Sequence, residues 1–349
     1  MEQKRQYNLD LLRIFACFMV LILHVAGHNW GKVSPDSLEW HAFNFYDVLV
    51  RSAVPLFLML SGKLFLSRDD ISLKKLFSKN ILKIVFVYLL WSFLYAVDKI
   101  GIRNIIASPD ISLLFSVTVA SKYHLWYLPA LVSVYLLVPV FISMKPYKDG
   151  KILNYAAILT FIFTVVRYSV FLLPINASLK SLLEEINFPF DLYAGYFLFG
   201  YILDKYKDKL KKVHSIILVL TFFITVAATS LGSYYLSANA GEGVAVLYNS
   251  LFISTFIEAA IIFLLFLRLS VPPVGKTVST VIKKASLYTF FVYLFHPFII
   301  EHLDLWFEVD SLSFSPIISV PALSVLLFVL CMTVAMIIDR IPVVRRILM

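Results

Sequence analysis

The stretch Asn8-Leu-Asp-Leu-Leu-Arg-Ile-Phe-Ala-Cys-Phe-Met-Val-Leu-Ile-Leu-His-Val-Ala-Gly-His28 decides how this chain folds. Its apolar run, residues 9–28, has the length of roughly 20 residues that a helix needs to cross the hydrocarbon core of a bilayer. Lys4 and Arg5 precede the run, as in a signal peptide, but its end carries no small-residue cleavage site. We therefore expect a retained helix that spans the membrane.

Nine further apolar runs follow. They lie at residues 43–66, 80–97, 124–143, 152–173, 190–203, 214–236, 245–267, 285–303 and 317–338. The run 190–203 is short, and the stretch 104–119 is broken by Pro109 and Asp110, which suits a re-entrant or interfacial segment. The sequence predicts an all-α polytopic membrane protein with about ten transmembrane helices, in a range of nine to eleven, as a single domain over residues 1–349.

The composition excludes the soluble classes of protein. Of the 349 residues, 60% are apolar and 15% are charged, whereas soluble domains have about 45–50% and about 25%. A soluble enzyme, a disordered chain and a collagen-like fibre are therefore ruled out. Cys17 and Cys331 both lie in apolar runs, so a disulfide scaffold is not expected either.

The basic residues predict the orientation. Most of the 31 Lys and Arg residues fall in alternate loops, beginning with the N-terminus, which places both termini in the cytoplasm. The net charge of +9 is explained by this positive-inside pattern, and nucleic-acid binding has no support. We expect a multi-pass protein of the cell (plasma or inner) membrane, with the lipid bilayer as its constant partner.

The first run carries four polar side chains on one stripe. Charged residues inside a span cost roughly 2.5–3.5 kcal/mol each on insertion scales and need a reason. At 100° per residue, Asp10, Arg13, His24 and His28 share one helix face, and Asp10 can pair with Arg13. Asp10, Arg13 and His28 also suit interfacial positions. His24 lies within the apolar core, as a titrating group or as a hydrogen-bonded structural histidine.

Other spans also contain polar residues. Glu258 is a lone carboxylate near the centre of its span, and is functional or paired with Arg51, Arg167 or His296. In the second span, Ser61-Gly62 permits close helix approach and Pro55 frees a backbone carbonyl. Tyr293 and His296 share a helix face. An interfacial belt accounts for Trp126 but not for His124.

Soluble-enzyme motifs are lacking: the sequence has no phosphate-binding loop, dinucleotide glycine pattern, nucleophile elbow or zinc spacing. An intramembrane catalyst and a transporter or flippase both remain open. No inverted repeat supports the transporter. An amino-acid uptake module is a third option, but the chain has no room for the racemase domain found beside such modules.

Six motifs in order resemble membrane acyltransferase family 3. They are Asp10 and Arg13 followed by ten residues and His24, Val54-Pro-Leu-Phe-Leu-Met-Leu-Ser-Gly62, Lys79-Asn-Ile-Leu-Lys83, His124-Leu-Trp-Tyr-Leu128, Gly195-Tyr-Phe-Leu-Phe-Gly200, and Ser286 to Pro297. The resemblance covers essentially the whole chain and is closest to small single-domain O-acetyltransferases. Lys79 and Lys83 stand where the family usually has two arginines, which puts the donor contacts there in doubt.

The resemblance implies transfer of an acyl group, usually acetyl from cytoplasmic acetyl-CoA, to a hydroxyl of a cell-surface or envelope glycan. No metal is implied. The catalytic set we expect is His24 as base with Asp10 and Arg13 of the family motif, together with Glu258 from its buried charge. The expected donor contacts are Arg13, Lys74, Lys75, Lys79 and Lys83, and the expected substrate contacts are Ser61, His124, Trp126, Tyr293 and His296. The acceptor and the oligomeric state stay open, a homo-oligomer included.

Overall fold

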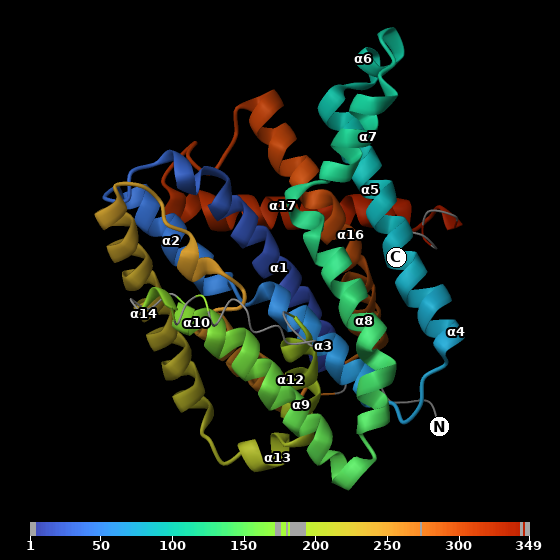
Figure 1. Ribbon diagram of the computed structural model, residues 1–349. Helices are drawn as coiled ribbons and strands as arrows, with labels where there is room; N and C mark the ends of the chain where they lie inside the picture. Colours follow the sequence, from blue (N-terminus) through green and yellow to red (C-terminus); the bar gives the residue numbers. More distant parts are fainter. Residues whose placement is uncertain are drawn as a thin grey trace.

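The computed structural model describes residues 5–171, 176–178, 181, 193–272, 274–342 and 345, and these residues form helices and turns without a strand (Figure 1). The α-helices are α1 (Tyr7–Asn29), α2 (Leu38–Val50), α3 (Ala53–Leu66), α4 (Leu73–Lys75), α5 (Leu82–Ile100), α6 (Ile102–Ala107), α7 (Ile111–Ala120), α8 (Tyr127–Met144), α9 (Lys151–Phe161), α10 (Arg167–Phe171), α12 (Ala194–Lys205), α13 (Lys207–Leu210), α14 (Ser215–Ala240), α15 (Ile253–Arg268), α16 (Lys276–Phe307) and α17 (Pro316–Ile338). The helix η3 (Tyr123–Trp126) precedes α8.

The chain is an all-α polytopic membrane protein. Eight helical segments in the described ranges are long and apolar enough to cross a membrane: Tyr7–Lys32, Leu38–Leu66, Leu73–Ile100, Tyr123–Met144, Lys151–Val170, Ser215–Ala240, Val246–Arg268 and Pro316–Ile338. They coincide with eight of the ten expected runs. The run 285–303 lies inside α16, whose serine, tyrosine and histidine residues lower its hydropathy. The run 190–203 overlaps α12, and residues 190–192 lie outside the described residues.

Among the described residues the predicted alternation of loops is confirmed, because loops expected on one side gather at one end of the bundle. At the end that carries the N-terminus, Asn8 donates to the carbonyl of Phe266, Lys145 pairs with Asp69, and Lys284 pairs with Asp339 near the C-terminus. We call this end the basic face. Other contacts close the opposite face, where Asn29 donates to Asp310 and Tyr234 donates to Asp36.

Helix α1 lies at the centre of the bundle and contacts α2, α3, α15, α16 and α17 (Figure 1). Because α1 and α16 both begin at the basic face, the two helices run parallel. Leu12 and Leu21 of α1 are fully buried in the apolar core. The polar stripe of α1 is therefore surrounded by protein rather than by lipid.

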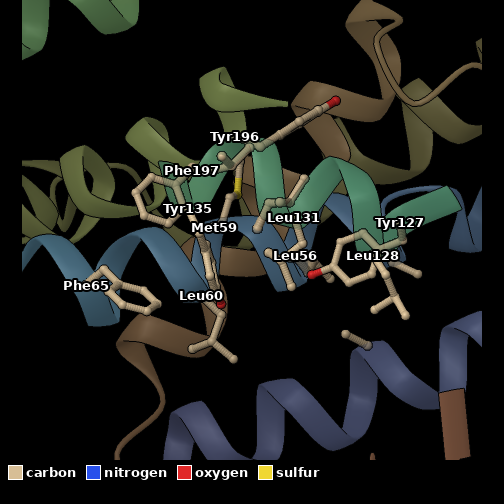
Figure 2. Packing of buried hydrophobic residues seen from close by; sticks show 14 of the residues in the cluster. Leu56, Met59, Leu60, Phe65, Tyr127, Leu128, Leu131, Tyr135, Tyr196 and Phe197 are labelled. Atoms are coloured by element: carbon tan, nitrogen blue, oxygen red, sulfur yellow. The ribbon is translucent and has the colours of Figure 1, made fainter. Parts of the chain in front are cut away.

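Helices α3 and α12 cross with backbone contact, as the Ser61-Gly62 pair predicted. A Cβ added at Gly62 would overlap the carbonyl of Phe197, and one at Gly200 would overlap the carbonyl of Met59. Figure 2 shows Met59 and Phe65 of α3 in the buried cluster with Phe197 of α12 and Tyr135 of α8. The two glycines fix how closely α12 approaches the centre of the protein.

The second span is interrupted between α2 and α3, at Arg51 and Ser52. Pro55 has no backbone N–H, so the carbonyl of Arg51, four residues earlier, lacks its usual helical donor. This break places a charged residue in the middle of the span. The stretch 104–119 forms α6 and α7, and α7 with its 10 residues is too short for an eleventh span.

Candidate active site

The polar stripe of α1 faces α16 along its whole length. At the basic face, Ser286 of α16 donates to Asp10 (2.9 Å) and accepts from Arg13 (3.3 Å). Further along, the rings of His24 and His296 stack with centroids 5.0 Å apart. The stripe therefore exists as the helical periodicity predicted, and one neighbouring helix supplies its polar partners.

The expected pairing of Asp10 with Arg13 is wrong. Asp10 is paired with Arg5, whose Nε lies 2.6 Å from the carboxylate, and no ion pair joins Asp10 to Arg13. The backbone outside the helix start brings Arg5 back over the first turn, where its guanidinium makes two bonds to the carboxylate. Arg13 is left facing Ser286 and the space beside it.

At the opposite end of the stripe, His28 bonds to Asp304 of α16 across 3.0 Å. The structure therefore gives His28 a defined partner near the opposite face, beyond the interfacial position expected for it. This contact lies one turn above His24, so α1 and α16 are tied together on both sides of the histidine pair.

Three histidines from three segments meet in the half of the bundle nearer the opposite face. His24 of α1 stacks on His296 of α16, and the ring of His124 of η3 lies 5.5 Å from His296. His124 and His296 are buried, whereas His24 is only half-buried. Tyr123 covers another side of His24, at 5.2 Å between centroids. We call His24, His124 and His296 the histidine cluster.

Hydrogen bonds to backbone carbonyls hold the histidine cluster in place. Tyr293 donates to the carbonyl of His124 (2.7 Å), and Tyr95 donates to the carbonyl of Leu294 (2.8 Å). Nδ1 of His296 lies 3.1 Å from the carbonyl of Val292. Because a carbonyl can only accept, Nδ1 carries the proton of the neutral ring, and Nε2 presents its lone pair. The predicted juxtaposition of Tyr293 and His296 is confirmed.

A cavity of about 410 Å³ opens at the basic face below the stripe. It is lined by Arg5, Gln6, Leu9, Asp10, Arg13, Lys63, Leu64, Ser67, Arg68 and Asp69. We call it the basic cavity. Lys63 is paired with Asp204 (2.7 Å), and Arg5 with Asp10, which leaves Arg13 and Arg68 as the guanidinium groups without an ion pair among its lining residues.

The lysines expected to bind the donor do not line the basic cavity. Lys74, Lys75 and Lys79 are exposed on the segment before α5, and Lys83 is half-buried. Their role stays a prediction. Arg68 and Lys63 line the cavity, although the sequence pattern singles out neither as a site residue. Their place at the cavity depends on how α3 packs against α1, which no local pattern reports.

Tyrosine hydroxyls lie between the basic cavity and the histidine cluster. Arg13 interacts electrostatically with Tyr135 and Tyr127 of α8, and Tyr135 donates to Ser61 over 3.5 Å. Tyr127 contacts Tyr293 at 5.8 Å between centroids. The helical rise places His24 about 16 Å from Arg13. We call Ser61, Tyr127, Tyr135 and Tyr293, which follow one another in contact between these two ends, the tyrosine route.

Glu258 is buried in α15 with 1% of its surface exposed, and it forms no ion pair or hydrogen bond with any residue in the described part of the chain. Arg51 is the cation that acts on it, but Arg51 is paired with Asp47. Arg51 also acts on His24. Arg51, one of the three expected partners, therefore acts on Glu258 without binding it directly.

Trp126 does not join the histidine cluster. Its side chain is 42% exposed and packs against Tyr193, at 5.2 Å between ring centroids. This position suits the interfacial belt considered as its simpler role. A part in substrate binding stays a prediction for this residue. The described residues also contain no group of three or more His, Cys, Asp or Glu side chains that could hold a metal ion.

Comparison with known protein families gives one match. The family model described as an acyltransferase domain, that of acyltransferase family 3, matches residues 6–340. The match covers nearly the whole chain, from the start of α1 to the end of α17. No curated protein and no solved structure matches the chain.

Proposed function

The chain belongs to acyltransferase family 3, and on that premise we propose that it transfers an acetyl group from acetyl-CoA to a hydroxyl of an envelope glycan. One observation carries the proposal: the stripe of α1 joins a basic cavity at one face to the histidine cluster toward the other. A donor from one side of a membrane and an acceptor from the other can meet along such a stripe. Family membership favours this reaction over the transport alternative.

The basic cavity supports acetyl-CoA as the donor. The phosphates of coenzyme A are multiply charged, and guanidinium groups bind phosphate oxygens with paired hydrogen bonds. Arg13 and Arg68 line the cavity and have no ion pair within its lining, and Arg13 uses one guanidinium nitrogen on Ser286, so further donors of both side chains can bind phosphate. Lys74, Lys75, Lys79 and Lys83 lie outside the cavity and would act on the phosphates only at longer range.

The tyrosine route supports passage of the thioester arm toward His24. Ser61, Tyr135 and Tyr293 offer hydroxyls along it, and these suit the amide groups of a pantetheine arm. The span of about 16 Å between Arg13 and His24 is bridged by an extended arm rather than by the nucleotide. The phosphates thereby stay at the basic face while the acetyl group reaches the cluster.

Transfer at the histidine cluster needs a base and a place for negative charge. His24 accepts the proton of the acceptor hydroxyl, whose oxygen bonds to the thioester carbonyl carbon. The C–S bond then breaks, and the coenzyme A thiolate takes the proton from His24. Asp10 and Arg13 act at the donor end of the stripe. Tyr123, whose ring packs against His24, offers a hydroxyl for the oxyanion.

The proposal is tested by following labelled acetyl groups. Protein in nanodiscs receives acetyl-CoA carrying a labelled acetyl group and the envelope glycans of the producing cell, and mass spectrometry detects one acetyl per modified sugar. His24→Ala should lower transfer by about 100-fold or more. His41→Ala is the matched control, because His41 of α2 packs against Tyr234 of α14, away from the cluster. Transfer in His24→Ala at the level of the control would remove His24 from the mechanism.

A further inference from the structure

An apolar cavity of about 300 Å³ lies on the side of α1 that faces away from the polar stripe. All of its lining side chains are apolar, and they come from α1, α2, α14 and α15. On α1 they are Phe15, Phe18, Met19 and Ile22, which at 100° per residue centre on the face opposite Arg13 and His24. We call it the apolar cavity. It shares no lining residue with the basic cavity.

The apolar cavity opens toward lipid rather than toward water. Each of its four helices belongs to a segment that is long and apolar enough to cross a membrane. Phe15 and Phe223 of the lining are 41% and 53% exposed, and the buried residues of α14 all lie beyond Phe223. Helix α14 stands at the edge of the bundle (Figure 1). The medium beside the cavity is therefore the hydrocarbon of the bilayer.

The apolar cavity extends from the basic face toward the middle of the membrane. Val219 lies four residues after the start of α14, and Leu265 lies three residues before the end of α15, so both are about 5 Å from helix ends at the basic face. Val50 marks the deep end, at the break between α2 and α3. This is the depth of the hydrocarbon chains of one leaflet.

Arg268 places a positive charge at the end of the cavity nearer the basic face. It follows Leu265 by three residues, on the same side of α15. Its guanidinium donates to two backbone carbonyls of the segment before α14 and to the hydroxyl of Ser215, at 2.7, 2.8 and 3.1 Å. These acceptors are neutral, and Arg268 forms no ion pair with any residue that the structure describes. Its charge is therefore not balanced by a carboxylate.

Lys212 adds a second positive charge at the same place. It is exposed and lies between Leu210 and Val213, whose carbonyls accept from Arg268. The neighbouring Lys211 is paired with Asp208, whereas Lys212 has no carboxylate partner within the described ranges. Basic groups between membrane helices at the cytoplasmic side typically bind anionic lipid headgroups.

We propose that the apolar cavity binds a hydrocarbon chain of an anionic phospholipid from the leaflet at the basic face, with the lipid phosphate at Arg268 and Lys212. The volume of about 300 Å³ lies at the lower end of the range for small-molecule pockets and suits a single chain. The chain gains contacts with the lining but little selectivity, because all lipid tails are similarly apolar. The two cations supply the preference for an anionic headgroup.

The position of the cations distinguishes this lipid from a lipid-linked glycan. Such a glycan carries its phosphate on the same side of the membrane as its sugars, which the proposed function places at the opposite face. Arg268 lies at the basic face, close to Phe266, whose carbonyl accepts from Asn8 at the start of α1. A phospholipid bound here packs behind the helix that carries Arg13 and His24, and it stays outside the tyrosine route.

The test counts bound lipid without requiring turnover. Protein freed of lipid in detergent is titrated with dioleoyl phosphatidylglycerol or with dioleoyl phosphatidylcholine, whose chains are the same, and native mass spectrometry measures one-to-one binding. We expect phosphatidylglycerol to bind about tenfold or more tightly than phosphatidylcholine. Equal binding of the two lipids would overturn the proposal.

Charge variants assign the headgroup. Lys212→Gln should weaken phosphatidylglycerol about fivefold, and Arg268→Gln at least as much, while phosphatidylcholine changes little. Lys212 is exposed, so its variant keeps the test valid if loss of Arg268 impairs folding. Arg340→Gln is the matched control, because Arg340 is an exposed arginine at the basic face, after α17. Unchanged binding of phosphatidylglycerol in Lys212→Gln and in every folded Arg268 variant would contradict the proposed headgroup site.

A filled cavity tests the chain site. Val219→Trp places an indole in the apolar cavity and should remove most of the binding of phosphatidylglycerol. Leu220→Trp is its control, because Leu220 is 55% exposed on the same helix and does not line the cavity. Full binding in Val219→Trp would show that the chain lies elsewhere. A polyprenyl phosphate that binds more tightly than phosphatidylglycerol, and is lost in Val219→Trp, would give the cavity to another lipid and overturn the proposal.

Discussion

The arginine and lysine residues at the basic face differ in their surroundings. The surroundings of each residue decide how strongly it can bind a phosphate. Arg68 lines the basic cavity, whereas Lys74 and Lys79 project into solvent on the segment before α5. A guanidinium in a concave site can bind a phosphate through two hydrogen bonds. An exposed ammonium contributes a screened charge, worth about 1 kcal/mol or less.

Arg68→Ala should therefore raise the KM for acetyl-CoA about tenfold or more and change kcat little, because the phosphates lie far from the reacting carbonyl. Lys79→Ala with Lys83→Ala should raise the KM less, and the increase should shrink at high salt as the exposed lysine charge is screened. Steady-state kinetics at two salt concentrations measures both. A larger effect of the lysine pair than of Arg68 would move the donor phosphates to the segment before α5.

The three rings of the histidine cluster differ in how far neighbouring side chains cover them. His124 and His296 are both buried and packed against tyrosines, whereas His24 keeps an accessible edge. This difference in burial, rather than chemical type, distinguishes the three rings as candidates for the base.

At the scale of elements, the crossing of α3 and α12 supports the wall of the route. α3 carries Ser61 and Lys63 on either side of Gly62, so displacing α3 would move both the route and the cavity lining. The contact is between backbones, and it cannot relax by rotating a side chain. The position of the site thus depends on two residues that have no side chain at all.

Gly62→Ala should destabilise the protein strongly, at the upper end of the roughly 1–3 kcal/mol typical of overpacking, because its Cβ would overlap the carbonyl of Phe197. The measurement is the yield of folded protein and its unfolding temperature in detergent. Gly27→Ala is the control, since a Cβ there meets no atom within 4 Å. Equal behaviour of the two variants would show that α3 and α12 do not touch through their backbones.

At the scale of the whole molecule, the two faces differ in charge and in the loops they gather. Helices α1 and α16 run parallel, and side-chain hydrogen bonds join them near both faces. Acetyl transfer across a membrane requires that these faces lie in different compartments. The direction in which the protein sits in the bilayer therefore decides whether the proposed donor can reach the basic cavity.

Cysteine labelling in cells checks the orientation. Lys211→Cys, at the basic face, should react with a membrane-impermeant thiol reagent only after permeabilisation, whereas Asp36→Cys, at the opposite face, should react in intact cells. The native Cys17 and Cys331 are buried and should stay unlabelled in the parent protein. The reverse pattern of labelling would place the basic cavity outside and contradict acetyl-CoA from the cytoplasm as the donor.

The sequence by itself determined the features that follow from the local periodicity of a helix. The spans and the stripe that carries Arg13 and His24 depend on helix geometry and on the exclusion of polar groups from lipid. A helix repeats every 3.6 residues whatever surrounds it. These features therefore appear in the structure where the spacing predicted them.

Only the tertiary structure decided which polar groups are partners. Arg5 rather than Arg13 binds Asp10. Arg51 pairs with Asp47, and Glu258 has no ion-pair partner in the described part of the chain. Arg68 reaches the basic cavity, while Lys79 does not. Each outcome depends on competition within a few ångströms between side chains on separate segments. The free energy of such a contact depends on distance, direction and burial, and these exist only once the helices have packed.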